Sequence, residues 1–180
     1  YTIVTIHAHE GDMDRFIPAN FLVDFAREMI DAVADVFVVH GPHVLRAVEI
    51  YNGKPILYSL GDFLFQNETL QRLPYENYSR YELGEEKGLA DFNDARYKND
   101  SVGFPATPEI WEAVIAMPIF DGKKLAELRL HPISLGHGEA RTVRGRPMFA
   151  DETLSKKIIG DLQRLSEPFG TQIDYVGGVG

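Results

Sequence analysis

Hydrophobic positions in residues 1–40 follow two different periods. The β-branched run from Ile3 to Ile6 predicts a buried strand over residues 2–7 that ends at His7. Apolar residues spaced three or four apart between Phe21 and Val33 predict an amphipathic helix that starts at Asn20. A second apolar run over residues 36–39 predicts another buried strand. Strand, helix and strand in this order predict a βαβ unit, and therefore a parallel sheet with a right-handed crossover.

Two hairpins and a helix are predicted further along the chain. Residues 48–51 and 55–58 flank Asn52-Gly53-Lys54, and residues 113–120 and 125–133 flank Asp121-Gly122, which are typical turns between antiparallel strands. Asp151 is a suitable N-cap for a helix over residues 154–165. Residues 173–176 are expected to form a last strand, and the glycine-rich end is expected to fray.

Residues 66–108 show little periodicity and are rich in Asn, Glu, Asp, Arg and Tyr. A structureless loop of that length is uncommon in a compact domain, so we expect a partly ordered insertion with a short helix near residues 86–97. Its tyrosines either cover a site as a lid or pack on the sheet. Residues 1–180 are interpreted as a portion of one domain that carries this insertion.

Charge and composition narrow the function classes. The chain has 18 Lys and Arg residues against 27 Asp and Glu residues, a formal net charge of −9, which argues against a nucleic-acid-binding protein. It has no cysteine, which excludes disulfides, thiolate metal sites and a cysteine nucleophile. No apolar stretch approaches the ~18–20 residues that a membrane span needs. Because the chain opens inside a strand and without Met, we expect it to be a piece of a longer protein.

Four of the six histidines follow predicted strands. His7 and His9 come at the end of the first strand and precede Glu10, whereas His40 and His43 follow the second strand in His40-Gly41-Pro42-His43. The carboxyl edge of a parallel sheet is where open α/β proteins bind ligands, and imidazole with carboxylate suits Zn, Mn, Fe or Ni. His7, Glu10, His40 and His43 are therefore candidate metal ligands. The alternative is a plain α/β domain whose histidines only complete turns; His131 and His137 stand alone and are expected to have no direct role.

A longer pattern carries a resemblance to a known family. It consists of Asp35-Val36-Phe37-Val38-Val39-His40-Gly41-Pro42-His43 and, after it, Gly53-Lys54-Pro55-Ile56-Leu57-Tyr58-Ser59-Leu60-Gly61-Asp62-Phe63-Leu64-Phe65. This pattern resembles the bacterial CapA family of poly-γ-glutamate capsule-synthesis proteins, which are relatives of the calcineurin-like metallophosphoesterases. The strand that ends at His7 and the stretch from Leu165 to Thr171 support the resemblance.

The resemblance implies an α/β, metallophosphoesterase-like fold of layered sheets and helices. This chain would be its C-terminal portion, with a βαβ unit and two hairpins. His7 matches a metal ligand at the end of an inner strand, and His40 with His43 matches a pair that contacts metal and substrate oxyanion. Catalytic roles are therefore expected for His40 and His43.

Departures from the family pattern affect the expected chemistry. Val39 replaces a usual glycine, Asp62 replaces a usual asparagine, and His9-Glu10 replaces the residues that usually follow the first histidine. The Asp62 carboxylate adds negative charge, which favours a cation and opposes an anionic substrate. The family's first strands, with their further ligands, have no counterpart in this chain. The N-terminal half of the same protein is therefore an expected partner.

If the site is completed, the resemblance implies metal-assisted hydrolysis at a centre of divalent Mn, Zn or Fe ions, dinuclear when both halves are present. His40 or His43 would protonate the leaving group or stabilise developing charge. A phosphoester or an anionic polymer is the expected substrate, with Asp62, Arg144 and Arg146 as weaker candidates for contacting it. The alternative function is a non-catalytic component of capsule-polymer assembly or export. An extracytoplasmic location, with anchoring through a segment not present here, is implied by the family alone.

Overall fold

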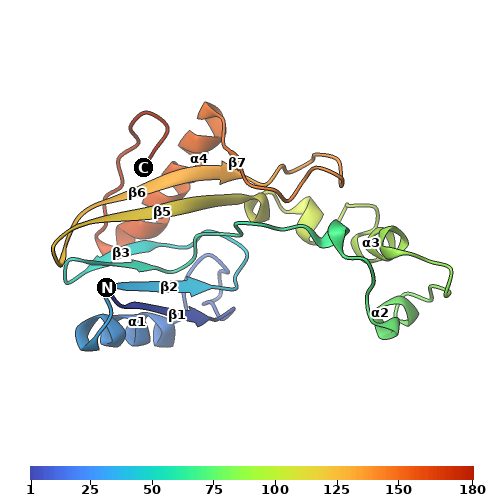
Figure 1. The fold of residues 1–180 in the computed structure, drawn as a ribbon, viewed down its shortest axis with the longest axis horizontal. Helices are drawn as coiled ribbons and strands as arrows, with labels where there is room; N and C mark the ends of the chain where they lie inside the picture. The colour runs from blue at the N-terminus through green and yellow to red at the C-terminus, as the bar shows by residue number, and fades with distance from the viewer.

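The computed structural model describes residues 1–180 as two β-sheets with helices around them (Figure 1). The strands are β1 (Ile3–His7), β2 (Val36–His40), β3 (Val48–Tyr51), β4 (Lys54–Leu57), β5 (Glu112–Asp121), β6 (Lys124–Ser134) and β7 (Met148–Phe149). The α-helices are α1 (Asn20–Ala32), α2 (Tyr75–Ser79), α3 (Leu89–Tyr97) and α4 (Glu152–Ser166). Short 3-10 helices span Asn67–Thr69, Phe104–Ala106, Pro108–Trp111 and Glu167–Phe169. No helix combines the length and the apolar character needed to span a membrane.

The first sheet has four strands in the order β1-β2-β4-β3. β1, β2 and β4 are parallel, and β3 pairs antiparallel with β4 across the Asn52-Gly53 turn. The predicted βαβ unit and first hairpin are therefore confirmed. The α/β class expected from the sequence is also confirmed, because α1 connects two neighbouring parallel strands.

Both faces of β2 are covered, which explains its continuous apolar run. On one face α1 presents Leu22, Ala26 and Ile30 to a cluster that includes Phe37 and Ile56. The other face packs against the second sheet and α4 in a separate cluster; its members include Val36, Leu57, Val114, Leu130, Ile158 and Leu162. Alternate residues of β2 thus enter different cores, as a strand covered on both sides requires. The prediction of a buried strand over residues 2–7 is wrong, because β1 lies at the edge of the sheet and has no buried residue.

The second sheet has the order β5-β6-β7 and is antiparallel. Its long hairpin confirms the predicted strand pair, with the turn at Gly122-Lys123, one residue later than the predicted Asp121-Gly122. The Asp151 side chain accepts a hydrogen bond from the backbone N–H of Leu154 at 2.8 Å, so its predicted role as the N-cap of α4 is also confirmed. In Figure 1, β5 and β6 cross above the first sheet, and α1 lies on its opposite side.

The C-terminal prediction is wrong on two counts. Residues 173–176 do not form a strand; Val176 makes only an isolated bridge to Val179. The chain end does not fray either, because Gly180 exchanges two backbone hydrogen bonds with Leu130, at 2.8 and 3.0 Å. The physical reason is a tight reversal at Gly177 and Gly178, both with positive φ, which turns the tail onto the open edge of β6.

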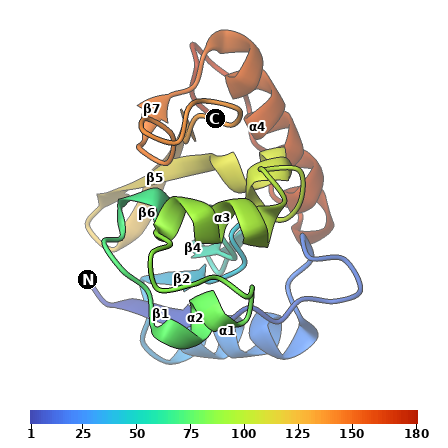
Figure 2. The ribbon, with the colours of Figure 1, turned by 90° about the vertical axis from the view of Figure 1, so that its right-hand side faces the viewer.

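Residues 66–108 project from the end of the molecule toward which β1 and β2 point (Figures 1 and 2). The expected helix near residues 86–97 is α3, and α2 is a second helix that the sequence pattern did not predict. The insertion is therefore ordered, and it lies at the same end of the sheet as the candidate histidines.

Candidate functional site

The parallel register of β1 and β2 places two candidate histidines side by side. His7 is the register partner of His40, and the ring nitrogens Nδ1 of both residues lie 2.9 Å apart. The backbone N–H of Ala8 donates to the carbonyl oxygen of His40, which extends the pairing one residue past β1. Both imidazoles are exposed at the carboxyl edge of the sheet, as the strand-end pattern predicted.

His9 joins these two histidines, although the sequence analysis did not count it among the candidate ligands. Its Nε2 lies 2.9 Å from Nε2 of His7, and its ring centroid lies 5.7 Å from that of His43. We call His7, His9, His40 and His43 the histidine cluster. The signal for His9 was its position two residues after His7, because residues i and i+2 of an extended chain point to the same side.

Gly41 allows the close approach of the two segments. Its φ is +122°, and a Cβ at this position would lie 3.2 Å from both the Ala8 carbonyl oxygen and His7 Nε2. The buried side chain of Arg46 holds the loop that carries His9, because it donates hydrogen bonds to the carbonyl oxygens of His9, Glu10 and Arg15. Backbone geometry and one buried guanidinium therefore position the cluster.

His43 differs from the other histidines because it has a carboxylate partner. Its Nδ1 lies 3.0 Å from each carboxylate oxygen of Asp62. The hydrogen bond to Asp62 raises the pKa of His43, and partial burial opposes that rise. The ring also packs against Phe65 and Phe104, with centroid distances of 5.9 and 5.2 Å, so the insertion contributes one wall of this site.

Two other candidates stay outside the cluster. Glu10 is exposed, and only its backbone carbonyl oxygen makes a hydrogen bond, with Arg46. Arg146 is exposed and forms no side-chain hydrogen bond or ion pair. The structure therefore does not place these side chains against the imidazoles.

Arg144, which was also a candidate for contacting substrate, is buried in the protein interior. Its side chain is only 4% exposed and forms ion pairs with Glu68 at 2.5 Å and with Asp100 at 2.9 Å. Its guanidinium lies 5.3 Å from the ring centroid of Trp111. Arg144 thus ties both ends of the insertion to the body of the domain, a role that its loop sequence did not indicate.

The histidine cluster does not present a complete set of donors for a metal ion. No group of three or more His, Asp or Glu side chains is arranged to hold one. His7 faces His40 with Nδ1 and His9 with Nε2, so its contacts are two separate pairs of nitrogens rather than one convergent set. A typical protein zinc site has three or four protein donors. The residues of this chain therefore do not fit a complete metal site by themselves.

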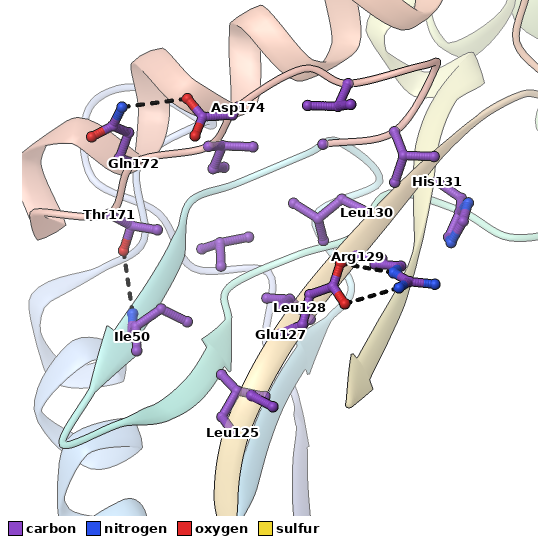
Figure 3. Close-up of a pocket in the computed structure, with 16 residues that line it drawn as sticks. Ile50, Leu125, Glu127, Leu128, Arg129, Leu130, His131, Thr171, Gln172 and Asp174 are labelled. Atoms are coloured by element: carbon purple, nitrogen blue, oxygen red, sulfur yellow. Dashed lines mark hydrogen bonds and ion pairs between the residues drawn. The ribbon is translucent and has the colours of Figure 1, made fainter. Parts of the chain in front are cut away.

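A cavity of about 650 Å³ lies away from the histidine cluster, between β3, β6 and the C-terminal tail. Figure 3 shows Ile50, Leu125, Leu128 and Leu130 around it, with the tail residues Thr171 to Asp174 along its rim. The Thr171 hydroxyl accepts a hydrogen bond from the backbone N–H of Ile50. No residue of the histidine cluster lines this cavity, and sequence analysis did not predict it.

Fold and geometry together define an α/β protein in which imidazoles cluster at the carboxyl edge of the parallel strands. Residues 1–67 match the family model described as "Bacterial capsule synthesis protein PGA_cap". The "PGA biosynthesis protein CapA" of Bacillus subtilis is 46% identical over 63 residues, which are 35% of this chain and 17% of that protein. A "Probable polyglutamine synthesis accessory protein" of Mycobacterium tuberculosis is 42% identical over 68 residues, which are 38% of this chain and 18% of that protein.

The chain is therefore related to the CapA family of bacterial capsule-synthesis proteins through the part that contains the whole histidine cluster and Asp62. A match over the full chain is to the protein y4sH of Sinorhizobium fredii, which is 38% identical over 190 residues. This chain spans 40% of the length of that relative.

Proposed function

We propose that this chain carries one face of the metal centre of a metal-dependent, phosphoesterase-like hydrolase that acts in capsule-polymer synthesis. The observation that carries the proposal is the histidine cluster at the carboxyl edge of β1 and β2, within the segment related to the CapA family. The names of the Bacillus and Mycobacterium relatives refer to PGA biosynthesis and to polyglutamine synthesis, which supports a role in polymer synthesis.

The proposal requires further ligands from outside these residues, because the cluster offers pairs of nitrogens and no group of three donors. β1 provides a place for them, since it is the edge of the first sheet and Ile3 is 62% exposed. Parallel strands are usually covered, and open edges pair readily with another strand. We therefore propose that a part of a longer protein pairs with β1 and completes the centre beside His7, with divalent Mn, Zn or Fe as the metal.

Within that site this chain's own residues would have distinct roles. His7 and His40 would bind metal, whereas His43, held by Asp62, would hold or donate a proton at the leaving oxygen of a phosphoester. The Asp62 carboxylate and the net charge of −9 make a polyanion a poor direct ligand in the absence of cations.

Elemental analysis and activity of the full-length protein test this proposal. We expect bound divalent metal and hydrolysis of a generic phosphodiester or phosphomonoester with added Mn²⁺. His7→Ala and His40→Ala should each lower turnover more than about 100-fold, since even outer-shell changes at metal sites cost ~10–100-fold. His137→Ala, at an exposed histidine outside the cluster, is the matched control. A protein with neither bound metal nor turnover would exclude the hydrolase.

A second function is favoured by two departures from the CapA pattern, Val39 and Asp62: the fold serves polymer assembly or export without catalysis. The discriminating experiment is complementation of a deletion strain with a His40→Ala/His43→Ala double variant. Restored polymer production would support the non-catalytic role. Failure of the double variant, with rescue by His137→Ala, would support the hydrolase.

A further inference from the structure

The protonation of most histidines in the cluster is not settled by their contacts. His7 faces His40 with one ring nitrogen and His9 with the other, and either nitrogen of each pair can be the donor. His43 is different, because its Nδ1 faces the carboxylate of Asp62. An ionised carboxylate only accepts hydrogen bonds, so the proton of this contact must belong to the imidazole.

We propose that Asp62 is a positioning residue that holds His43 in the tautomer protonated at Nδ1, which leaves Nε2 as the nitrogen presented to a ligand or to substrate. The functional meaning of Nε2 rests on the function proposed above, whereas the tautomer itself is a property of this chain. Second-sphere carboxylates commonly orient imidazoles in this way.

The surroundings of His43 limit the other ways its ring could turn. Its backbone has φ +60°, a left-handed conformation that is unfavourable in a non-glycine residue, and its chain neighbours Pro42 and Val44 are buried. Phe65 and Phe104 pack against the ring. The Asp62 side chain is 19% exposed, so water competes only in part for its oxygens. Backbone, aromatic wall and carboxylate therefore select one ring orientation.

Asn at position 62 could make the same contact, because its side-chain carbonyl oxygen also accepts a hydrogen bond from Nδ1–H. The usual asparagine of the CapA pattern is thus compatible with the positioning role. The contact requires only a hydrogen-bond acceptor at position 62, and it does not depend on the negative charge of Asp62.

The test is long-range ¹H–¹⁵N NMR of the full chain with labelled histidine, at about pH 9, where an ordinary histidine with pKa ≈ 6.5 is neutral. His43→Ala assigns the resonances. We expect His43 to be protonated at Nδ1 in the wild type and in Asp62→Asn. Asp62→Ala and Asp62→Leu, which lack an acceptor, should shift His43 to the tautomer protonated at Nε2. The resonances of His131 and His137 report whether each variant is folded.

Two results would overturn the proposal. One is a wild-type His43 protonated at Nε2, which requires no variant at all. The other is a folded Asp62→Ala or Asp62→Leu chain in which Nδ1 stays protonated. The NMR measurements use neither metal nor substrate. An inactive full-length protein would therefore exclude the proposed hydrolase, whereas the tautomer of His43 would still be decided by NMR. In an active protein, turnover should fall at least about 10-fold in Asp62→Ala and should fall less in Asp62→Asn, which keeps the acceptor.

Discussion

Replacing Arg144 by alanine should destabilise the domain strongly. The side chain is 4% exposed, and its ion-pair partners Glu68 and Asp100 are 14% and 31% exposed. Breaking a buried ion pair costs about 3–5 kcal/mol, because the remaining charge is left without a partner. Asp100 keeps Arg141 as a partner and is partly solvated, which places the expected loss near the lower end, at about 3 kcal/mol. For a chain of this size that corresponds to a melting temperature roughly 6–12 °C lower.

Urea unfolding followed by circular dichroism measures this loss, with Arg129→Ala as the matched control. Arg129 pairs with Glu127 at the surface, where the two side chains are 45% and 50% exposed, so its removal should cost no more than about 1 kcal/mol. Hydrogen exchange should also speed up across residues 66–108 in Arg144→Ala, because the insertion loses its tie to the body. Equal losses in the two variants would refute the reasoning.

Three further outcomes are expected from the same unfolding assay. The hydrogen bond from Arg141 lowers the pKa of Asp100, so this contribution to stability is present above about pH 4 and is lost as the pH falls through the lowered folded-state pKa. Asp100→Asn should therefore flatten the dependence of the unfolding free energy on pH below about pH 4. Gly145→Ala should cost more than Gly138→Ala, because both positions have positive φ but only at Gly145 does the new Cβ collide with the Phe65 carbonyl oxygen. Leu22→Ala, at a fully buried position against the sheet, should cost about 2–5 kcal/mol; a loss below 1 kcal/mol would contradict the assigned core.

Much of the fold could be predicted because it depends on local patterns. The strand before His7, the helix from Asn20 and the run at residues 36–39 differ in period, and a period reports which faces of an element are buried. Both hairpins were found from turn residues, and α4 from its cap at Asp151. The tail could not be predicted, because Gly180 is held by Leu130, a contact between distant parts of the chain.

The sequence predicted only those parts of the candidate site that lie at the ends of the parallel strands. Parallel pairing makes His7 and His40 neighbours once both strands are recognised. The sequence pattern did not indicate that Asp62 would face His43, since 19 residues separate them and both strands of the first hairpin lie between. Arg144 looked like a loop arginine able to bind substrate until its partner Glu68, 76 residues earlier in the chain, was located.

Residue order alone therefore specified the α/β class, the elements of the parallel sheet and the edge at which the imidazoles gather, because period, turn chemistry and strand direction are encoded locally. Packing assigned each polar side chain its partner: Asp62 to His43, Glu68 and Asp100 to Arg144, and Arg46 to the loop of His9. These contacts join residues far apart in the chain. Their distances depend on how the insertion and the loops close onto the sheet, and hydrophobic spacing carries no information about that closure.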